Sequence, residues 1–278
     1  MNLPHLLTAL VVGVVAGLHF STWGMYKDSP HEGFAWPKYF RSPLVGALMA
    51  VIAYVIARPD LGHATTLVVF FGSAYVLERG AVEFWKTFLR NEDQSKYFIP
   101  MQFAVFGNVV HGKGRRLVVG AIIAAAVIFI FLGVHWTLRG SATLSIPVVL
   151  AVGSISGWIS AFLGAWKDAP VEGFQPLKFV RSPLWTAFYA LVLASFTTSI
   201  LAVIMAALGF TIATLETYKT FFFPSKPRGK FAGKPVQHPY MLERRKPFAV
   251  LYVSIWILLI AGFVMAFASP YRGLLDLF

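Results

Sequence analysis

One group of charged and polar residues occurs twice in this chain, in the same order and at the same spacing. Residues 27–44 read KDSPHEGFAWPKYFRSPL and residues 167–184 read KDAPVEGFQPLKFVRSPL, and the two stretches are identical at 11 of 18 positions. A shorter match follows in each half, where EFWKTF at residues 83–88 corresponds to ETYKTF at residues 216–221. Agreement of this length at fixed offsets of 140 and 133 identifies an internal duplication. The shared side chains are therefore the first candidates for chemistry.

The repeated Lys, Arg and Ser have the chemistry of an anion site. They are Lys38, Arg41 and Ser42 in the first copy and Lys178, Arg181 and Ser182 in the second. Because Ser is a favoured helix N-cap and Pro suits the first helical position, each Ser-Pro pair predicts the start of a helix. Free N–H groups at a helix N-terminus, together with two nearby cations, suit phosphate or carboxylate. The alternative is that the cations only contact anionic lipid headgroups.

Two repeated acids in each copy allow two interpretations. They are Asp28 and Glu32 in the first copy and Asp168 and Glu172 in the second. Carboxylate oxygens are ligands that Mg²⁺ accepts, often together with phosphate. The interpretation that we favour is a salt bridge from these acids to Lys38, Arg41 or the other loop, and we expect no metal site. The chain contains neither a P-loop nor a dinucleotide-binding fingerprint.

A third group of repeated charges lies partly outside the motif, and we expect its members to act as gate, ion-binding or salt-bridge positions. The group contains Lys27, Glu83, Lys86, Lys167, Glu216 and Lys219. Each Glu precedes its Lys by three positions, so a local ion pair on one helical face is the default expectation. The alternative is that an acid at the membrane end of a short helix binds an ion or a proton.

The histidines carry a weaker signal. His111 and His238 lie in polar loops and correspond loosely between the halves, and we expect them to be solvated. His19 and His135 lie in apolar runs without a counterpart in the other half, so we expect buried histidines bonded to a neighbouring helix rather than haem ligands. The sequence identifies no cofactor.

Composition places these residues in a membrane protein. The 278 residues are 57% hydrophobic and only 13% charged, well below the roughly 25% charged residues of ordinary globular domains. Mean hydropathy is +0.68. The N-terminal apolar run lacks a basic segment before it and is too long for a signal peptide. The chain has no cysteine, which excludes disulfides, thiolate metal sites and Cys nucleophiles.

The apolar runs predict an all-α protein with eight transmembrane helices, because about 20 apolar residues cross the hydrocarbon core. We place six helices at about 3–25, 43–57, 64–77, 117–138, 144–166 and 247–269, and two short helices within 183–215 that reverse at about 197–199. Two tandem four-helix repeats result, 1–140 and 141–278, in parallel orientation because four is an even number. The apolar run at 43–57 is only 15 residues long, and short segments at matching positions of two repeats are typical of a transporter's binding site.

The distribution of positive charge predicts the orientation in the membrane. The four loops that follow the odd-numbered helices contain 21 of the 24 Lys and Arg. The positive-inside rule puts these loops in the cytoplasm and both termini outside, in a multi-pass protein of the cell (inner) membrane. The net charge of +12 is thus explained by topology, with anionic lipid headgroups as the expected partner and no nucleic acid. A second copy of the chain is a further candidate partner.

These observations favour a transporter or channel-like protein for an anionic, phosphate-bearing solute or lipid. The predicted site lies at the cytoplasmic face between the repeats. One alternative is a Mg²⁺-dependent membrane enzyme that acts on a lipid phosphate. Another is a non-catalytic scaffold whose duplicated loops bind a soluble partner. Equal preservation of both copies favours transport or scaffold over an enzyme with one active site.

Overall fold

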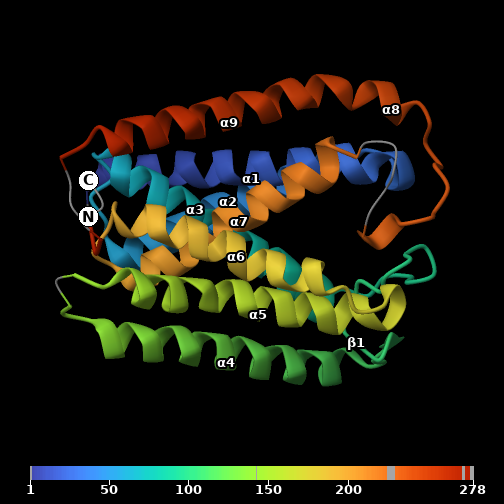
Figure 1. Ribbon diagram of the computed structural model, residues 1–278. Helices are drawn as coiled ribbons and strands as arrows, with labels where there is room; N and C mark the ends of the chain where they lie inside the picture. Colours follow the sequence, from blue (N-terminus) through green and yellow to red (C-terminus); the bar gives the residue numbers. More distant parts are fainter. Residues whose placement is uncertain (1, 142, 224–228, 271–272, 276–278) are drawn as a thin grey trace.

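The computed structural model describes residues 2–141, 143–223, 229–270 and 273–275. The described part of the chain is almost entirely helical, and its long helices run back and forth between two ends (Figure 1). The long helices are α1 (Leu3–Glu32), α2 (Trp36–Ala57), α3 (Ala64–Phe84), α4 (Lys113–Leu138), α5 (Ile146–Glu172), α6 (Pro176–Ala194), α7 (Ile200–Phe221) and α9 (Lys246–Phe267). Four short elements are the π-helix η1 (Trp85–Leu89), strands β1 (Ala104–Val105) and β2 (Asn108–Val109), and the 3-10 turn η2 (Gly229–Phe231). A four-residue helix, α8 (Met241–Arg244), precedes α9.

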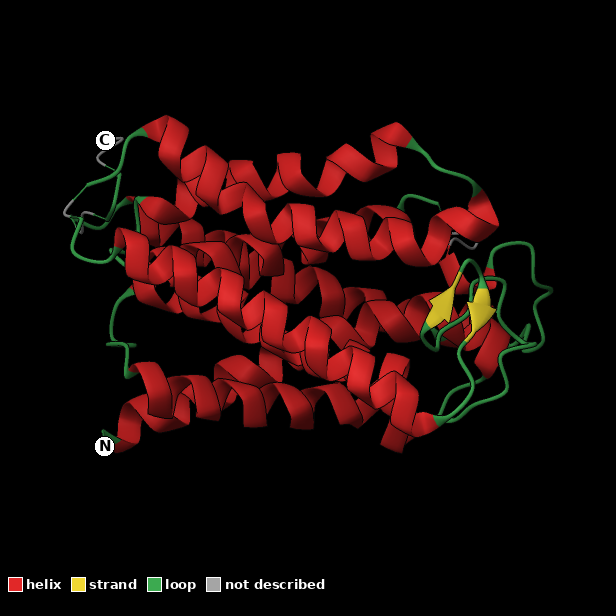
Figure 2. Ribbon diagram, turned by 90° about the horizontal axis from the view of Figure 1, so that it is seen from below, coloured by secondary structure: helices red, strands yellow, loops and turns green. Residues whose placement is uncertain are grey.

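The two ends of the helical bundle differ in their loops. Both termini lie at one end, and the antiparallel β1–β2 hairpin lies at the other (Figure 2). The second end also carries the turns after α1 and α5 and the segment 229–245 (Figure 1). We call this the basic end. The repeated charged residues of both halves lie at or near it.

Six helices in the described part of the chain are long and apolar enough to cross a membrane. They are Leu3–Glu32, Trp36–Ala57, Lys113–Leu138, Ile146–Glu172, Ile200–Phe221 and the continuous stretch Met241–Phe267. Helices α3 and α6 fall outside this set, since α3 carries Glu78, Arg79 and Glu83 and the 19-residue α6 carries Lys178 and Arg181. The outward faces of α4 and α9 expose large apolar side chains along their whole length. Both properties are those of a multi-pass membrane protein.

The helix starts predicted at Ser42 and Ser182 are wrong. Helix α1 continues through the motif to Glu32, the chain turns at Gly33 with φ +71°, and α2 begins at Trp36. The second copy repeats this geometry, with a turn at Gly173 (φ +79°) and α6 beginning at Pro176. The two Ser-Pro pairs therefore lie inside helices. An apolar run indicates which part of a helix lies in hydrocarbon. The helix itself can continue beyond that part through charged residues, whose charged ends reach water.

Helix α2 is longer than predicted, so its length no longer indicates a binding site. The helix has 22 residues and spans about 33 Å at 1.5 Å per residue, enough for a hydrocarbon core of about 30 Å. The matching helix α6 has 19 residues. Neither helix is so short that it marks a binding site by its length alone.

Small residues bring the first two helices of each half into close contact at matching positions. A Cβ added to Gly13 would lie 2.7 Å from Cβ of Ala50, and one added to Gly153 would lie 2.1 Å from Cβ of Ala190. Gly17 likewise meets Pro43, as Gly157 meets Pro183. Each pair of contacts is related by the offset of 140. Close backbone approach at small residues is how membrane helices pack without a hydrophobic driving force.

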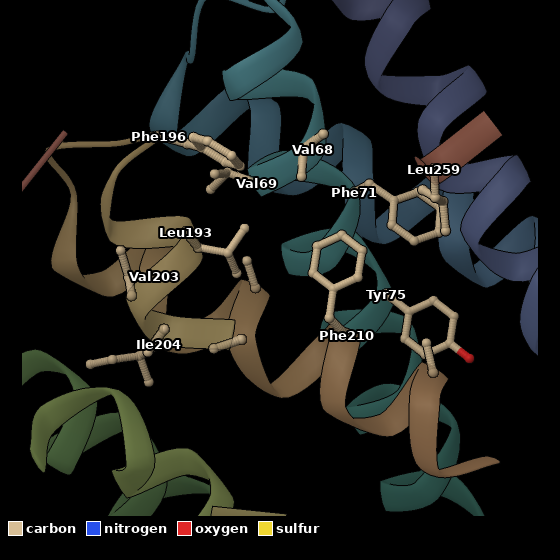
Figure 3. Close-up of a cluster of buried hydrophobic side chains, with 14 of the residues drawn as sticks. Val68, Val69, Phe71, Tyr75, Leu193, Phe196, Val203, Ile204, Phe210 and Leu259 are labelled. Atoms are coloured by element: carbon tan, nitrogen blue, oxygen red, sulfur yellow. The ribbon is translucent and has the colours of Figure 1, made fainter. Parts of the chain in front are cut away.

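Helices α3 and α7 cross at the centre of the molecule, where Gly72 meets Ala206 and Gly209. The largest buried cluster surrounds this crossing, and Figure 3 shows Phe71 and Tyr75 of α3 near Phe210 of α7. The Phe71 and Phe210 ring centroids are 5.8 Å apart. Helix α9 covers α1 and α3, whereas α4 covers α7 and η1. The middle of the bundle is thus filled by apolar side chains, and charged groups gather at the basic end.

Candidate functional site

An ion pair between the two halves lies at the centre of the candidate site. Lys27 Nζ of α1 is 3.2 Å from Oε2 of Glu216 in α7, and Lys219 Nζ is 2.9 Å from Oε1 of the same carboxylate. The side chains of Lys27 and Glu216 are only 17% and 10% exposed. Glu216 therefore accepts from the Lys three residues ahead of it, as predicted, and also from a Lys of the other half. The second contact was not predicted.

The corresponding residues of the other half form a related arrangement. Glu83 Oε1 lies 3.2 Å from Lys86 Nζ and 3.0 Å from Arg79 Nη1. Lys167, the counterpart of Lys27, lies within electrostatic range of Glu83. Each acid is thus held by its own helix and faces the motif Lys of the opposite half.

We call these seven residues the central charge cluster. Its members are Lys27, Arg79, Glu83, Lys86, Lys167, Glu216 and Lys219. The cluster contains five cations and two carboxylates, and three further acids, Asp28, Glu78 and Asp168, lie within electrostatic range of its cations. Lys86 is the member on η1, and burial lowers its pKa to about 8, against the attraction of Glu83. Burial has this effect because it disfavours the charged form of an amine.

The acids of the motif form ion pairs in both copies. Because α1 and α5 continue through the motif, the two acids of each copy lie four residues apart on one helical face. In the second copy Lys178 Nζ bridges them, at 2.8 Å from Asp168 Oδ2 and 2.6 Å from Glu172 Oε2. In the first copy Glu32 pairs with Lys38, and Lys230 bridges both acids.

Lys230 comes from the segment after α7, and its Nζ lies 3.0 Å from Asp28 Oδ2. These contacts are salt bridges of the kind that we favoured over Mg²⁺ ligation. Within the described ranges, no group of three or more His, Cys, Asp or Glu is arranged to hold a metal ion. The first motif is therefore joined to the second half through Lys230, and the second motif is closed on itself by Lys178.

The residues predicted to bind an anion lie within the first two turns of α2 and α6, and most of them are engaged with other side chains. Ser42 is 2% exposed within α2. Arg41 stacks on the Trp85 ring, 5.0 Å from its centroid, and Arg90 lies 5.4 Å from the same ring. In the second copy, Arg181 lines a groove formed by α6, α7 and α9. Lys38 and Lys178 are engaged with the acids described above, and Ser182 lies inside α6.

Two adjacent charged residues of α3, buried Glu78 and half-buried Arg79, escaped the prediction. Arg79 belongs to the central charge cluster, and Glu78 is 1% exposed with neither carboxylate oxygen hydrogen-bonded to another described residue. Ser42 lies beside Glu78. At the offset of 133 their counterparts are Thr211 and Ile212, so a search for repeated charges passes over them. Adjacent charges at the end of an apolar run were the signal that could have identified them.

Of the histidines, His19 is fully buried and behaves as expected. Its Nδ1 lies 3.2 Å from Tyr75 Oη, and its ring stacks on Tyr252 at 4.3 Å. The loosely matched loop histidines occupy different surroundings, because His111 is exposed whereas the His238 ring packs against Gly33. Half-buried His135 lies on α4, with no partner for its Nδ1 among the described residues.

The chain was compared with protein families, curated proteins and solved structures. No family model, no curated protein and no solved structure matches it, so the geometry described above carries the functional argument.

Proposed function

We propose that this chain transports an anionic solute across the cell (inner) membrane and binds it at the central charge cluster. The observation that carries the proposal is the convergence of five partly buried cations from both halves. Glu83 and Glu216 are each shared by two of these cations, so neither carboxylate serves one cation alone. An anion that enters the cluster would be a further partner for cations that are only partly hydrated. Phosphate or a phosphate ester suits Lys and Arg side chains that converge from several helices.

The carboxylates allow the lysines of the cluster to exchange one anionic partner for another. Glu216 forms ion pairs with Lys27 and Lys219 in this structure, and an arriving anion would compete with Glu216 for the same amines. Such competition frees α7 from α1 when the anion binds. Transport requires a solute to make different contacts in two conformations, and this exchange of partners is a source of that difference.

The duplication supports a transporter more than a channel. Matching glycine contacts in α1–α2 and α5–α6 favour two repeats, 1–140 and 141–278, in parallel orientation. The crossing of α3 and α7 at Gly72 and Gly209 separates the cluster from the opposite end with packed apolar side chains. A solute would pass only if the two halves rock about this crossing, as in alternating access. The proposal includes α3 and α6 as membrane spans, which brings the proposed number of transmembrane helices to eight.

The distribution of positive charge favours one side of the membrane for the central charge cluster. The loops of the basic end are rich in Lys and Arg, which favours a cytoplasmic position for this end and for the central charge cluster. Both termini would then lie outside. Anionic headgroups of the cytoplasmic leaflet would attract the same loops.

The test is anion flux into liposomes that contain the purified full chain. Uptake of labelled inorganic phosphate and of glycerol 3-phosphate is measured, with empty liposomes as the background. Lys27→Met and Lys167→Met should each lower the flux, whereas Arg139→Gln, at the opposite end, should not. Folded protein that neither binds nor moves either anion contradicts the proposal. Mg²⁺-dependent turnover of a phospholipid in the same liposomes would instead indicate a membrane enzyme.

A further inference from the structure

Helix α3 carries a buried acid that lies next to the central charge cluster but outside its ion pairs. Glu78 is 1% exposed, and both of its carboxylate oxygens are buried without a hydrogen-bond partner among the described residues. Glu83 and Glu216, the acids of the cluster, are in contrast each paired with two cations. Burial without a partner disfavours the charged form of a carboxyl. The position of Glu78 therefore suits a carboxyl that can hold a proton.

The cations near Glu78 are engaged with other side chains. Arg79 and Lys86 both lie within electrostatic range of Glu78, yet both form ion pairs with Glu83. Arg41 of α2 also lies within electrostatic range, and its guanidinium stacks on the Trp85 ring. These cations act on Glu78 from a distance, so its carboxyl keeps no fixed ionic partner.

The other groups around Glu78 come from the helices that pack against α3. Helix α2 places the buried hydroxyl of Ser42 beside the carboxyl. Titratable groups of the remaining helices interact with Tyr75 or Arg79, the neighbours of Glu78 on α3; they are His19 of α1, Glu216 of α7 and Tyr252 of α9. A neutral hydroxyl is thus the closest polar contact of Glu78 from another helix.

The corresponding place in the second half contains a neutral residue. At the offset of 133, Thr211 of α7 is the counterpart of Glu78, and it is also 1% exposed. Its hydroxyl donates to Oγ1 of Thr186 in α6, at 3.5 Å. Packing at this place is therefore achieved without a carboxyl in one half. The acid in the other half is not a requirement of the duplicated fold, which leaves a chemical role as its explanation.

We infer that Glu78 is a proton-binding site that serves the central charge cluster. It adjoins Arg79 of the cluster and lies about 7.5 Å along α3 from Glu83, whose side chain is 27% exposed. The proton comes from water at the basic end and adds to one carboxylate oxygen. Buried acids in membrane helices commonly take this role.

A proton on Glu78 would change the affinity of the cluster for an anion. Protonation removes a negative charge beside Arg79 and Lys86, so an anion should bind these cations more tightly. By reciprocity, a bound anion should favour the proton on Glu78. This consequence rests on the proposed function, and it would make the chain carry a proton together with its anion.

The first experiment detects the proton directly, in the absence of any anion. Infrared difference spectra of the purified full chain are recorded from about pH 5 to about pH 9, a range over most of which exposed carboxyls are ionised. The wild-type protein should show the carbonyl stretch of a protonated carboxyl, and this band should disappear as the pH rises. Glu78→Gln should lack the band. Glu243→Gln, which changes an exposed acid, is the matched control and should keep it.

A second variant keeps the test decisive if Glu78→Gln does not fold. Ser42→Ala removes only the hydroxyl beside the carboxyl, and it should shift the frequency of the band. Lys86→Arg should keep the band, which separates this proton from the one on the Lys86 amine. The inference is overturned if the wild type has no such band, if the band does not respond to pH, or if it persists in folded Glu78→Gln protein.

The second experiment measures protons taken up when inorganic phosphate binds in weakly buffered solution. Glu78→Gln should take up fewer protons per bound phosphate than the wild type, and the titration of phosphate itself is the same in both measurements. Equal uptake by the two proteins overturns the coupling. If phosphate binds to neither protein while the band depends on Glu78, the proton site stands and the anion proposal fails.

Discussion

Lys27 and Glu216 form an ion pair at 3.2 Å although 189 positions separate them in the chain. The pair joins α1 of the first half to α7 of the second, and each partner belongs to a stretch that the chain contains twice. Their counterparts, Lys167 and Glu83, face one another electrostatically across the same boundary. The charged residues of the duplication thus form ion pairs between the halves as well as within each half.

The first prediction concerns the stability of this pair. Glu216→Gln leaves Lys27 and Lys219 without their carboxylate in a site where the side chains are largely buried. We expect a loss of about 3 kcal/mol in the free energy of unfolding, as for other broken buried pairs. Denaturant unfolding in detergent measures the loss. Glu243→Gln is the control, because the exposed Glu243–Lys246 pair should contribute less than about 1 kcal/mol. Equal effects of the two substitutions would contradict the buried position of Glu216.

The second prediction concerns the equivalence of the halves. If Lys27 and Lys167 both contact the transported anion, replacing either by Met should weaken its binding by a similar amount. Loss of one charge-assisted hydrogen bond corresponds to roughly 1.5–3 kcal/mol. Isothermal titration with inorganic phosphate compares the two variants and their combination. Full binding in one variant and none in the other would indicate a site that belongs to one half alone.

The third prediction follows from the lowered pKa of Lys86. Because burial brings this pKa to about 8, the amine is protonated at pH 7 and loses its charge as the pH rises above 8. An anion favours the protonated form, so its affinity should fall between pH 7 and pH 9. Arg79 and Arg41, the guanidinium groups near Lys86, should stay charged in this range. Lys86→Arg should flatten the pH profile, because a guanidinium stays charged throughout. A profile that is unchanged in Lys86→Arg assigns the titration to another group.

The fourth prediction concerns the crossing of α3 and α7. A Cβ on Gly209 would lie 2.0 Å from the carbonyl oxygen of Gly72, so Gly209→Ala forces the backbones apart. We expect a loss of about 1–3 kcal/mol in unfolding free energy, typical of overpacking. Gly164→Ala is the control, since nothing lies within 4 Å of its added Cβ. That substitution should be neutral or slightly stabilising, because Ala favours a helix more than Gly does.

The fifth prediction tests the orientation in the membrane. The chain has no cysteine, so single cysteines report without background. Ser95→Cys, at the basic end, should react with an impermeant thiol reagent only from the cytoplasmic side. Asp60→Cys, in the exposed turn between α2 and α3, should react only from outside. Labelling in intact cells and in inverted vesicles distinguishes the two sides. The reverse pattern would place the central charge cluster on the outer face.

Several properties of this protein are determined by its sequence alone. Composition and apolar runs identify helices that can cross a membrane, because hydrocarbon accepts only segments that satisfy their own backbone hydrogen bonds. The repeated stretches select charged residues that the structure places at or near the basic end. The i, i+3 pairs at Glu83 and Glu216 also follow from helix geometry, which depends only on spacing.

Helix boundaries within the motif were decided by tertiary structure. Pro43 and Pro183 suggested helix starts, yet both lie inside helices and pack on Gly17 and Gly157. Proline normally disfavours a helix interior because it lacks an N–H group and crowds the preceding turn. Close packing against a glycine of the neighbouring helix holds these segments in place, and such a contact has no signature in a local pattern.

Pairing between the halves was likewise decided by tertiary structure. Spacing shows that Glu216 can reach Lys219, but only the packing of α1 against α7 brings Lys27 to the same carboxylate. The divergence of Arg41 and Arg181 has the same origin, because the two Arg residues match in sequence while Trp85 covers one and a groove opens beside the other. A side chain's local spacing follows from its helix, whereas its partners depend on every helix that packs around it.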